Sequence, residues 1–374
     1  MFAHSAASKE PWSIGFAVFP ILGSFDPQAL CFGTGLGVFF CIYHCILDIF
    51  LIDFLNMIEI LKEKISSDIL ENELLANHCT FRIGGPAKYF FVAKSGEEIK
   101  RAVEVAKELD LPFFIFSGGS NILFADQGFN GLVIKIQNAN YEIQDTKIIT
   151  EAGVALGRLV EAVADRGLTG LEWAAGIPGT IGGAVRGNAG AYGHDIGESV
   201  ETARIMNHEL RIMNIGKNEC KFRYRDSIFK QSKDIILEVV LILEEGDKEK
   251  IKDEMKKILK ARNEKLPLDF PSAGSVFKNV KVTDEILEKL KNCEIPSKFI
   301  ELGKIPVAWL VEQCNLKGKQ TGGAKISEKH ANFIVNIGKA TAKEVAELIE
   351  LVKAEISQKF GVKLEEEIEL VLGQ

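Results

Sequence analysis

Hydrophobic positions recur with helical or strand-like spacing along residues 57–374. Ser95 precedes a run to about Leu109 whose first turn carries two glutamates, which predicts a helix with Ser95 as its N-cap. Over residues 155–166, apolar side chains stand at 156, 159, 160 and 163, the period of a helix with one buried face. The uninterrupted apolar run at 111–116 is typical of a buried strand.

Similar patterns predict the remaining elements. Strands are expected at about 131–136, 147–151 and 235–243, helices at 248–264, 307–314 and 341–360, and a closing alternating strand over 362–372. Pro267 and Pro271 mark a domain boundary after the helix at 248–264. Because strands and helices interleave without a regular strand–helix–strand repeat, we expect an α+β protein with several lobes.

The first 56 residues differ from the rest in composition. They hold one of the 45 basic residues and four of the 52 acidic ones, but eleven of the 32 aromatics (24 Phe, 3 Trp and 5 Tyr). The 21 residues between Asp26 and Asp48 carry no formal charge, enough to cross a hydrocarbon core of about 30 Å. Pro27, Gln28 and the missing Lys/Arg flank argue against a membrane anchor, and no secretory signal is recognisable.

Three interpretations of residues 1–56 therefore stay open: a dispensable or spurious extension, an anchor or partner-binding segment, and an integral part of the fold. We favour the first, because Met57 begins a segment with the amphipathic pattern of a normal first helix.

Composition narrows the function classes. A length of 374 residues predicts two or three domains, and 47% hydrophobic with 26% charged residues is typical of soluble proteins. The net charge of -7 argues against nucleic acid as a partner. The seven cysteines form no C-x-x-C pair and no metal-ligand spacing, so we predict no metal site and a reducing cytoplasm as the compartment.

Two glycine-rich tracts carry candidate chemistry. The loop Ser117–Asn121 follows the strand at 111–116, and its small residues would let backbone N–H groups approach a phosphate, although a tight turn explains it equally well. The second tract, 174–193, has seven Gly in 20 residues, too many for a regular element, yet it is too apolar for a flexible linker. We expect it to pack against a planar cofactor or its pyrophosphate, the alternative being bends in a core.

Six motifs occur in an order that resembles one family. They stand at 80–87 (TFRIGGPA), 117–123 (SGGSNIL), 176–185 (GIPGTIGGAV), 224–227 (YRDS), 271–279 (PSAGSVFKN) and 322–333 (GGAKISEKHANF). This order is similar to that of the UDP-N-acetylenolpyruvoylglucosamine reductases, the MurB family. Only fifty residues separate Arg225 from Ser275, which resembles the compact class lacking an inserted loop with a capping Tyr. The resemblance covers residues 57–374 and stops at Met57.

The resemblance implies a three-lobed α+β fold, with a two-lobe FAD module of the vanillyl-alcohol-oxidase/PCMH type and a C-terminal α+β substrate lobe. The expected divisions are 1–56 as an extension outside the fold, 57–116 completed by 361–374 as the first flavin lobe, 117–265 as the second, and 266–360 as the substrate lobe. The FAD-binding residues that the resemblance implies are Arg82, Ser117, Gly118, Gly119, Ser120, Asn121, Gly176, Ile177, Pro178, Gly179, Thr180, Gly182 and Gly183.

The implied activity is reduction of an enolpyruvyl ether on a UDP-sugar to a lactyl ether, with NADPH as the hydride donor. Such a reaction leaves negative charge beside a carboxylate, so it needs a cation and then a proton. By resemblance these come from Arg225, Ser275 as proton donor and Glu367, while Tyr224, Lys278 and Asn279 bind substrate. Taken alone, Glu367 would be read as a solvated residue of an alternating strand, and only the family pattern selects it over Glu365 and Glu369.

Two other functions stay open at this point. One is a related flavin oxidoreductase acting on another sugar or alcohol. The other is a membrane-tethered flavin-binding protein whose hydrophobic first 56 residues define its role.

Overall fold

The computed structural model describes residues 57–371, so every expectation for residues 1–56, including the uncharged stretch, lies outside the described residues. A helix over residues 57–64 opens the described chain and buries Ile58 and Leu61, which confirms the amphipathic first helix. Within 57–371, no helix is both long and apolar enough to cross a membrane.

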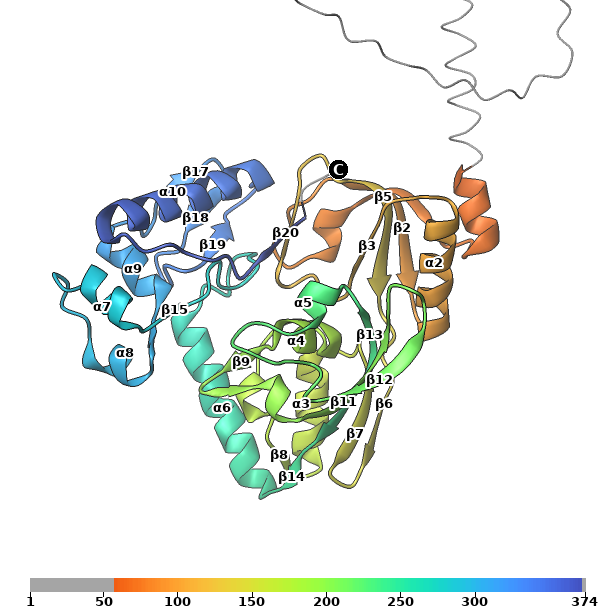
Figure 1. The fold of residues 1–374 in the computed structure, drawn as a ribbon, viewed down its shortest axis with the longest axis horizontal. Coiled ribbons are helices and arrows are strands. Elements are labelled where there is room, and N and C mark those ends of the chain that lie inside the picture. Colours follow the sequence, from red (N-terminus) through yellow and green to blue (C-terminus); the bar gives the residue numbers. More distant parts are fainter. Residues whose placement is uncertain (1–56, 372–374) are drawn as a thin grey trace, which may run out of the picture. The chain divides into compact units, whose positions relative to one another are not determined.

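The first sheet has the strand order β1 (Leu70–Leu74), β2 (Pro86–Ala93), β5 (Phe129–Ile136) and β3 (Phe113–Phe116). Strands β2, β5 and β3 run parallel, and α2 (Gly96–Glu108) packs against this sheet (Figure 1). The Ser95 hydroxyl accepts from the Glu98 N–H, which confirms it as the N-cap. Because β5 lies between β2 and β3, this sheet continues past residue 117, the expected boundary between the two flavin lobes.

The second sheet is antiparallel, with the order β12 (Ile212–Gly216), β11 (Val200–Met206), β13 (Ile235–Ile242), β7 (Lys147–Glu151) and β6 (Tyr141–Gln144). Packed with it are α3 (Leu156–Asp165), α4 (Ile181–Gly187), α5 (Phe229–Ser232) and α6 (Lys248–Lys265) (Figure 1). Short segments complete this part: β8 (Leu168–Thr169), η3 (Glu172–Ala174), β9 (Gly190–Ala191), β10 (His194–Asp195), η4 (Ile196–Glu198) and β14 (Glu244–Glu245). The short helix η2 (Leu75–His78) lies between β1 and β2 of the first sheet.

Helix α4 corrects the expectation that the second glycine tract is too Gly-rich for a regular element. The Thr180 hydroxyl caps the helix by accepting from the Gly183 N–H. A Cβ at Gly182 would stand only 2.7 Å from the Ala152 Cβ, so glycine here permits close packing of the helix against β7's end. Packing therefore outweighs the low helix propensity of glycine.

The last third of the chain is short strands and helices around a long helix. Its elements are β15 (Val280–Lys281), α7 (Asp284–Lys289), α8 (Ser297–Glu301), β16 (Lys304–Ile305), α9 (Val307–Gln313), β17 (Gln320–Thr321), β18 (Ala324–Ile326), β19 (Ile334–Asn336), α10 (Ala342–Phe360) and β20 (Glu369–Val371). Thr341 and Glu344 form a capping box at the start of α10. Strand β20 pairs in parallel with β4 (Ile122–Phe124).

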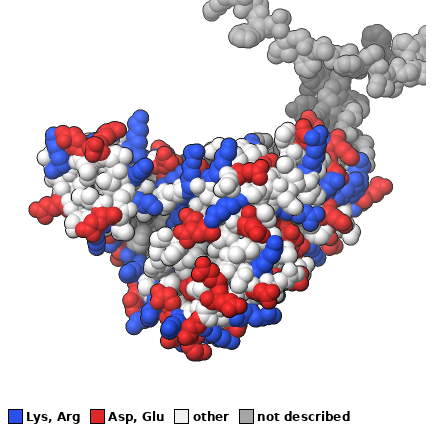
Figure 2. Space-filling view, turned by 60° about the horizontal axis from the view of Figure 1, so that its bottom comes forward, with Lys and Arg blue, Asp and Glu red and all other residues white. Residues whose placement is uncertain are grey.

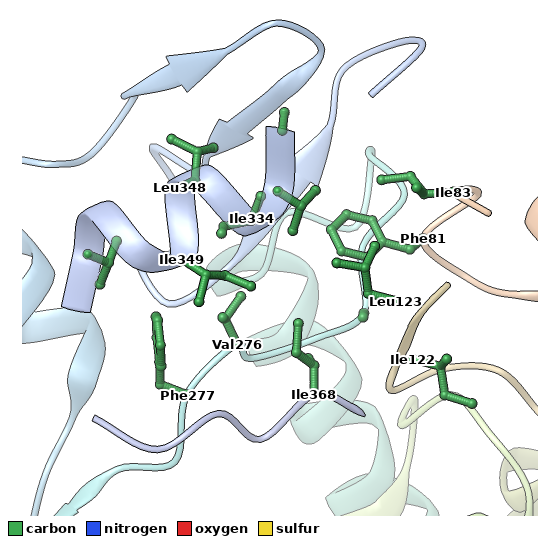
Figure 3. Packing of buried hydrophobic residues seen from close by; sticks show 14 of the residues in the cluster. Phe81, Ile83, Ile122, Leu123, Val276, Phe277, Ile334, Leu348, Ile349 and Ile368 are labelled. Atoms are coloured by element: carbon green, nitrogen blue, oxygen red, sulfur yellow. The ribbon is translucent and has the colours of Figure 1, made fainter. Parts of the chain in front are cut away.

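The core of this region joins segments that are distant in sequence. Figure 3 shows Phe81, Leu123, Val276, Ile349 and Ile368 in one cluster, contributed by five separate parts of the chain. Burial of these side chains fixes the 80–87, 117–123 and 271–279 motifs beside the C-terminal segment. On the face drawn in Figure 2, acidic and basic side chains are interspersed and do not gather by sign.

The predicted closing strand over 362–372 is wrong in extent. Within the described residues of this segment, up to Val371, the strand covers Glu369–Val371, and residues 361–365 are irregular. The segment makes separate backbone contacts instead of one ladder: Lys278 N–H donates to the Glu365 carbonyl, and Glu367 N–H donates to the Val276 carbonyl. The alternating sequence pattern over residues 362–372 therefore arises from an extended backbone, although no single strand pairs with it along its whole length.

Candidate functional site

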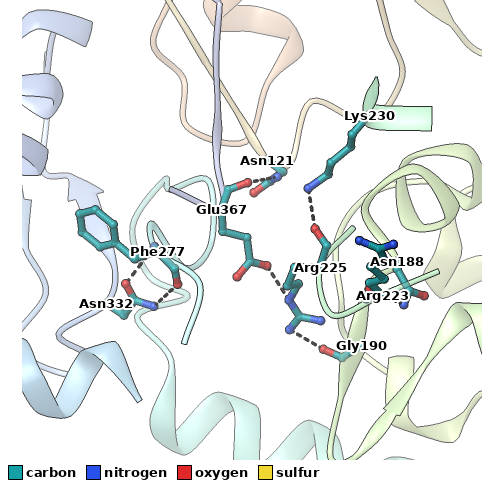
Figure 4. A network of polar contacts seen from close by, with 9 residues as sticks. All are labelled: Asn121, Asn188, Gly190, Arg223, Arg225, Lys230, Phe277, Asn332 and Glu367. Carbon is teal, nitrogen blue, oxygen red and sulfur yellow. Dashed lines mark hydrogen bonds and ion pairs between the residues drawn. The ribbon is translucent and has the colours of Figure 1, made fainter. Parts of the chain in front are cut away.

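The backbone of Glu367 is fixed by two of the sequence motifs (Figure 4). Its N–H donates to the Val276 carbonyl at 2.7 Å, and its carbonyl accepts from the Asn121 side chain at 2.9 Å. The Glu369 N–H in turn donates to the Asn121 carbonyl at 2.9 Å. The 117–121 loop and the 271–279 motif therefore meet at the C-terminal segment.

The Glu367 side chain forms an ion pair with Arg225. Its Oε1 lies 2.7 Å from the Arg225 Nε, and the two side chains are 19% and 23% exposed. The Nε–H is not directed at an acceptor, so the contact is mainly electrostatic, while Nη2 donates to the Gly190 carbonyl at 2.7 Å. Burial raises the pKa of the Glu367 carboxyl, against the lowering effect of the Arg225 charge.

Arg225 has an unusual backbone conformation, with φ of 55° in the left-handed region that non-glycine residues rarely adopt. Its carbonyl accepts from the Lys230 ammonium at 2.8 Å, and the Arg223 N–H donates to the Asp226 carbonyl across the same turn at 2.9 Å. Strained backbone of this kind persists where surrounding contacts enforce it and is frequent at functional sites.

Asn188 supports this turn, a residue to which the sequence gave no role. It is 2% exposed, its side-chain amide donates to the Arg223 carbonyl at 2.9 Å, and its Oδ1 accepts from the Gly197 N–H at 3.0 Å. It also ends α4 with φ of 43°. The buried Asn188 side chain therefore connects the second glycine tract to the turn that carries Arg225.

The acids around Glu367 each have a different partner. Glu365 is 77% exposed and pairs with Lys278 at 3.2 Å, Glu366 pairs with Lys353, and Glu369 accepts two hydrogen bonds from Arg186 at 2.6 and 3.0 Å. Glu367 alone of the four contacts Arg225 among the described ion pairs. The structure thus distinguishes Glu367 from its neighbours on geometry.

Ser275 lies on the segment that borders Glu367. It bridges to Phe333, and the next residue, Val276, accepts from the Glu367 N–H. Asn332 holds this segment from the other side: its Oδ1 accepts from the Phe277 N–H at 3.1 Å and its amide donates to the Phe277 carbonyl at 2.8 Å. The sequence motif at 322–333 contains Asn332, but only the fold shows this contact (Figure 4).

Tyr224, Lys278 and Asn279 lie around the same group. Burial raises the pKa of the Tyr224 phenol, while the Arg225 charge and hydrogen bonding to Asn279 oppose this shift. The Asn279 Oδ1 accepts from the Val307 N–H at 3.2 Å, and the Lys278 charge acts on Glu367. The structure therefore brings together the residues that the resemblance placed at the reacting centre and the substrate.

The two glycine tracts touch each other. A Cβ at Gly118 would stand 2.8 Å from the Gly179 Cα, and the Ser120 hydroxyl donates to the Pro178 carbonyl at 3.2 Å. A Cβ at Gly119 would stand 2.4 Å from the His78 carbonyl oxygen. Backbones this close leave no room for larger side chains. Small residues also let backbone N–H groups approach a phosphate, so these loops fit the diphosphate of a dinucleotide such as FAD.

Other predicted cofactor residues have structural contacts. The Ser117 hydroxyl donates to the Ile136 carbonyl at 2.9 Å. Gly176 has φ of 75°, which suits glycine, and Ile177 packs partly against the core of the second sheet. Arg82 is exposed, with φ of 54°, and its carbonyl accepts from the Asn336 amide at 3.4 Å.

Two family models match this chain, one over the region of the glycine tracts and one over the C-terminal region. Residues 87–214, which include both glycine tracts, match the FAD binding domain model, and residues 266–371 match the model of the UDP-N-acetylenolpyruvoylglucosamine reductase C-terminal domain. The chain is 38% identical over 321 residues to UDP-N-acetylenolpyruvoylglucosamine reductase of Caldanaerobacter subterraneus, covering 84% of this chain and 99% of that protein.

A second relative, the reductase of the same name from Bacillus velezensis, is also 38% identical over 321 residues, covering 85% of this chain and 99% of that protein. The crystal structure of UDP-N-acetylenolpyruvylglucosamine reductase (MurB) from Thermus caldophilus aligns with a TM-score of 0.65 and 32% identity, covering 80% of this chain and 98% of that one. The expected α+β flavoprotein fold is confirmed, and the chain belongs to the UDP-N-acetylenolpyruvoylglucosamine reductase family.

Proposed function

We propose that this protein reduces UDP-N-acetylglucosamine enolpyruvate to UDP-N-acetylmuramate, a step of peptidoglycan precursor synthesis in the cytoplasm, with NADPH as hydride donor and FAD as the flavin. The observation that carries this proposal is the pairing of Arg225 with Glu367 beside Ser275, where the glycine tracts and the 271–279 motif converge.

FAD supplies the redox chemistry, since a bound flavin accepts a hydride from NADPH and passes it to the substrate. We assign its binding to the two glycine tracts, 117–121 and 176–183, with Arg82. The lobe built on the first sheet and the lobe built on the second sheet, up to residue 265, hold it. Residues 266–360 form the lobe that binds the UDP-sugar.

Arg225 stabilises the charge that the reduction creates. Hydride addition to the terminal vinyl carbon leaves negative charge on the carbon that bears the carboxylate, and a fixed guanidinium lowers the energy of that enolate. The ion pair with Glu367 and the bond to the Gly190 carbonyl hold the guanidinium in one orientation. A group that is already oriented needs no reorganisation when the charge appears.

Ser275 donates the proton that completes the reduction. A hydroxyl is a weak acid, so it transfers a proton only to a strongly basic carbanion and needs neighbouring cations to stabilise the alkoxide. Arg225, Lys230 and Lys278 provide positive charge in this region, and each of the three charges acts to lower the pKa of Glu367. Tyr224, Lys278 and Asn279 are assigned to substrate binding.

Two measurements on the purified protein test the activity. The absorbance spectrum is expected to show bound flavin, and NADPH oxidation is expected to depend on UDP-N-acetylglucosamine enolpyruvate. A colourless protein would contradict the proposal. NADPH oxidation that is indifferent to this substrate would favour another flavin oxidoreductase of the same fold.

Separate half-reactions test the role of Ser275. Ser275→Ala is expected to leave flavin reduction by NADPH unchanged and to slow transfer to the substrate by about 10²- to 10⁴-fold, the usual contribution of a positioned acid. Ser272→Ala is the matched control, because its backbone carbonyl, and not its hydroxyl, is used by Thr80. Equal loss in both half-reactions of Ser275→Ala would remove it from the proton-donor role.

A further inference from the structure

A lysine from the substrate lobe reaches the candidate site across Tyr224. Lys304 lies on β16, which pairs with β15, and β15 begins directly after Asn279. Its ammonium nitrogen lies 3.7 Å from the centre of the Tyr224 ring. The guanidinium carbon of Arg225 lies 5.3 Å from the same ring centre. Two cations from different lobes therefore approach one aromatic side chain.

Lys304 has neither an ion pair like that of Lys278 nor a hydrogen bond like that of Lys230 among the described residues. Lys278 pairs with Glu365, and Lys230 donates to the Arg225 carbonyl. Within residues 57–371, the described contact of the Lys304 ammonium is the Tyr224 ring, and it has neither an ion pair nor a hydrogen bond. Lys304 is also half-buried, so this charge has lost part of its hydration, and no carboxylate of the described residues lies within ion-pair distance of it.

The surrounding charges leave the ammonium poorly stabilised. Burial lowers the pKa of Lys304, and the nearby Arg225 charge lowers it further, opposed by Asp195 on β10. An anion bound beside Lys304 would restore the lost solvation and screen the repulsion from Arg225. Such an arrangement is expected of a residue whose partner is a ligand.

We propose that Lys304 binds the diphosphate of the UDP-sugar and so determines the affinity for nucleotide-linked substrates. This inference rests on the proposed function. A lysine ammonium is a compact point charge suited to phosphate oxygens, whereas the planar fork of Arg225 suits a carboxylate. Arg225 is held by Glu367 near Ser275. Arg225 would therefore bind the substrate carboxylate, and Lys304 would bind the diphosphate of the same substrate.

Binding of UDP and of uridine to the flavin-loaded enzyme tests this assignment. Lys304→Met, which keeps the apolar stem, is expected to weaken UDP binding about 10- to 100-fold, the range for loss of one charge-assisted hydrogen bond. Uridine, which lacks phosphate, is expected to bind both proteins alike. Lys304→Arg should recover part of the UDP affinity. Lys298→Met is the control, because it removes the same charge from exposed α8.

Three results would overturn the assignment. One is UDP affinity unchanged in Lys304→Met, and another is equal weakening of UDP and uridine, which would show a structural role for Lys304. The third is weakening only of the enolpyruvyl substrate, which would assign Lys304 to the carboxylate. If Lys304→Met does not retain flavin, Lys304→Gln is compared with Lys304→Arg in the same titrations. Absence of enolpyruvyl reduction by the wild-type enzyme would instead count against the proposed function.

Discussion

Replacing Asn332 tests whether the segment carrying Ser275 is held as the structure shows. Asn332 is 4% exposed, and its amide makes two hydrogen bonds with the backbone of Phe277. Asn332→Leu leaves one buried N–H and one buried carbonyl without a partner. Each unpaired group costs about 1–3 kcal/mol, so the free energy of unfolding should fall by about 2–6 kcal/mol.

Urea unfolding followed by circular dichroism measures this loss, and half-reaction kinetics measure its effect on chemistry. Because the segment also positions Ser275, transfer to the substrate should slow, while flavin reduction by NADPH should be unchanged. A loss below about 1 kcal/mol would refute the reasoning, since even one unpaired buried group should cost that much.

Asn332→Asp separates the two hydrogen bonds. The carboxylate still accepts from the Phe277 N–H, but its second oxygen faces the Phe277 carbonyl, where only a protonated acid donates. Burial and this carbonyl should raise the folded-state pKa of the new acid, so its stabilising form is lost as pH rises through that pKa. We expect the deficit relative to wild type to shrink from pH 7 to pH 5. The exposed Asn315→Asp should show no such dependence.

Two other substitutions test the flavin loops and the ion pair. Gly118→Ala places a Cβ 2.8 Å from the Gly179 Cα, and an overpacking cost of about 1–3 kcal/mol should weaken FAD binding about 5- to 150-fold in a flavin fluorescence titration. Gly157→Ala in α3, where a Cβ meets nothing within 4 Å, should leave FAD affinity unchanged, and equal affinities for both variants would contradict the close approach. Because burial raises the pKa of Glu367, the wild type should lose stability as pH rises through that pKa, and Glu367→Gln should remove this part of the pH dependence. Identical unfolding profiles from pH 4 to pH 8 would show that Glu367 is not buried as described.

Regular elements with strong periodicity could be predicted from the sequence. The apolar positions at 156, 159, 160 and 163 are buried on α3, and Thr341 caps α10 where the last long helix was expected. Partners of strands could not be predicted, because pairing depends on the fold. Thus β5 was identified as a strand, but its place between β2 and β3 was not.

In the candidate site, too, the partners of single residues could not be predicted from the sequence, because they depend on the fold. Nothing local separates Glu367 from Glu365, since both belong to the acidic run 365–367. Only the fold pairs Glu367 with Arg225 and leaves Glu365 exposed beside Lys278. Asn188 and Asn332 had no sequence signal beyond membership of a motif, because their partners are backbone atoms 35 and 55 residues away.

The central claim is that this protein transfers reducing equivalents from a flavin to an enolpyruvyl UDP-sugar. Anaerobic rapid mixing of the NADPH-reduced enzyme with UDP-N-acetylglucosamine enolpyruvate tests it directly. We predict that the oxidised flavin absorbance returns in a single turnover and that mass spectrometry finds a product two hydrogen masses heavier than the substrate. A flavin that stays reduced in the presence of this substrate would contradict the account.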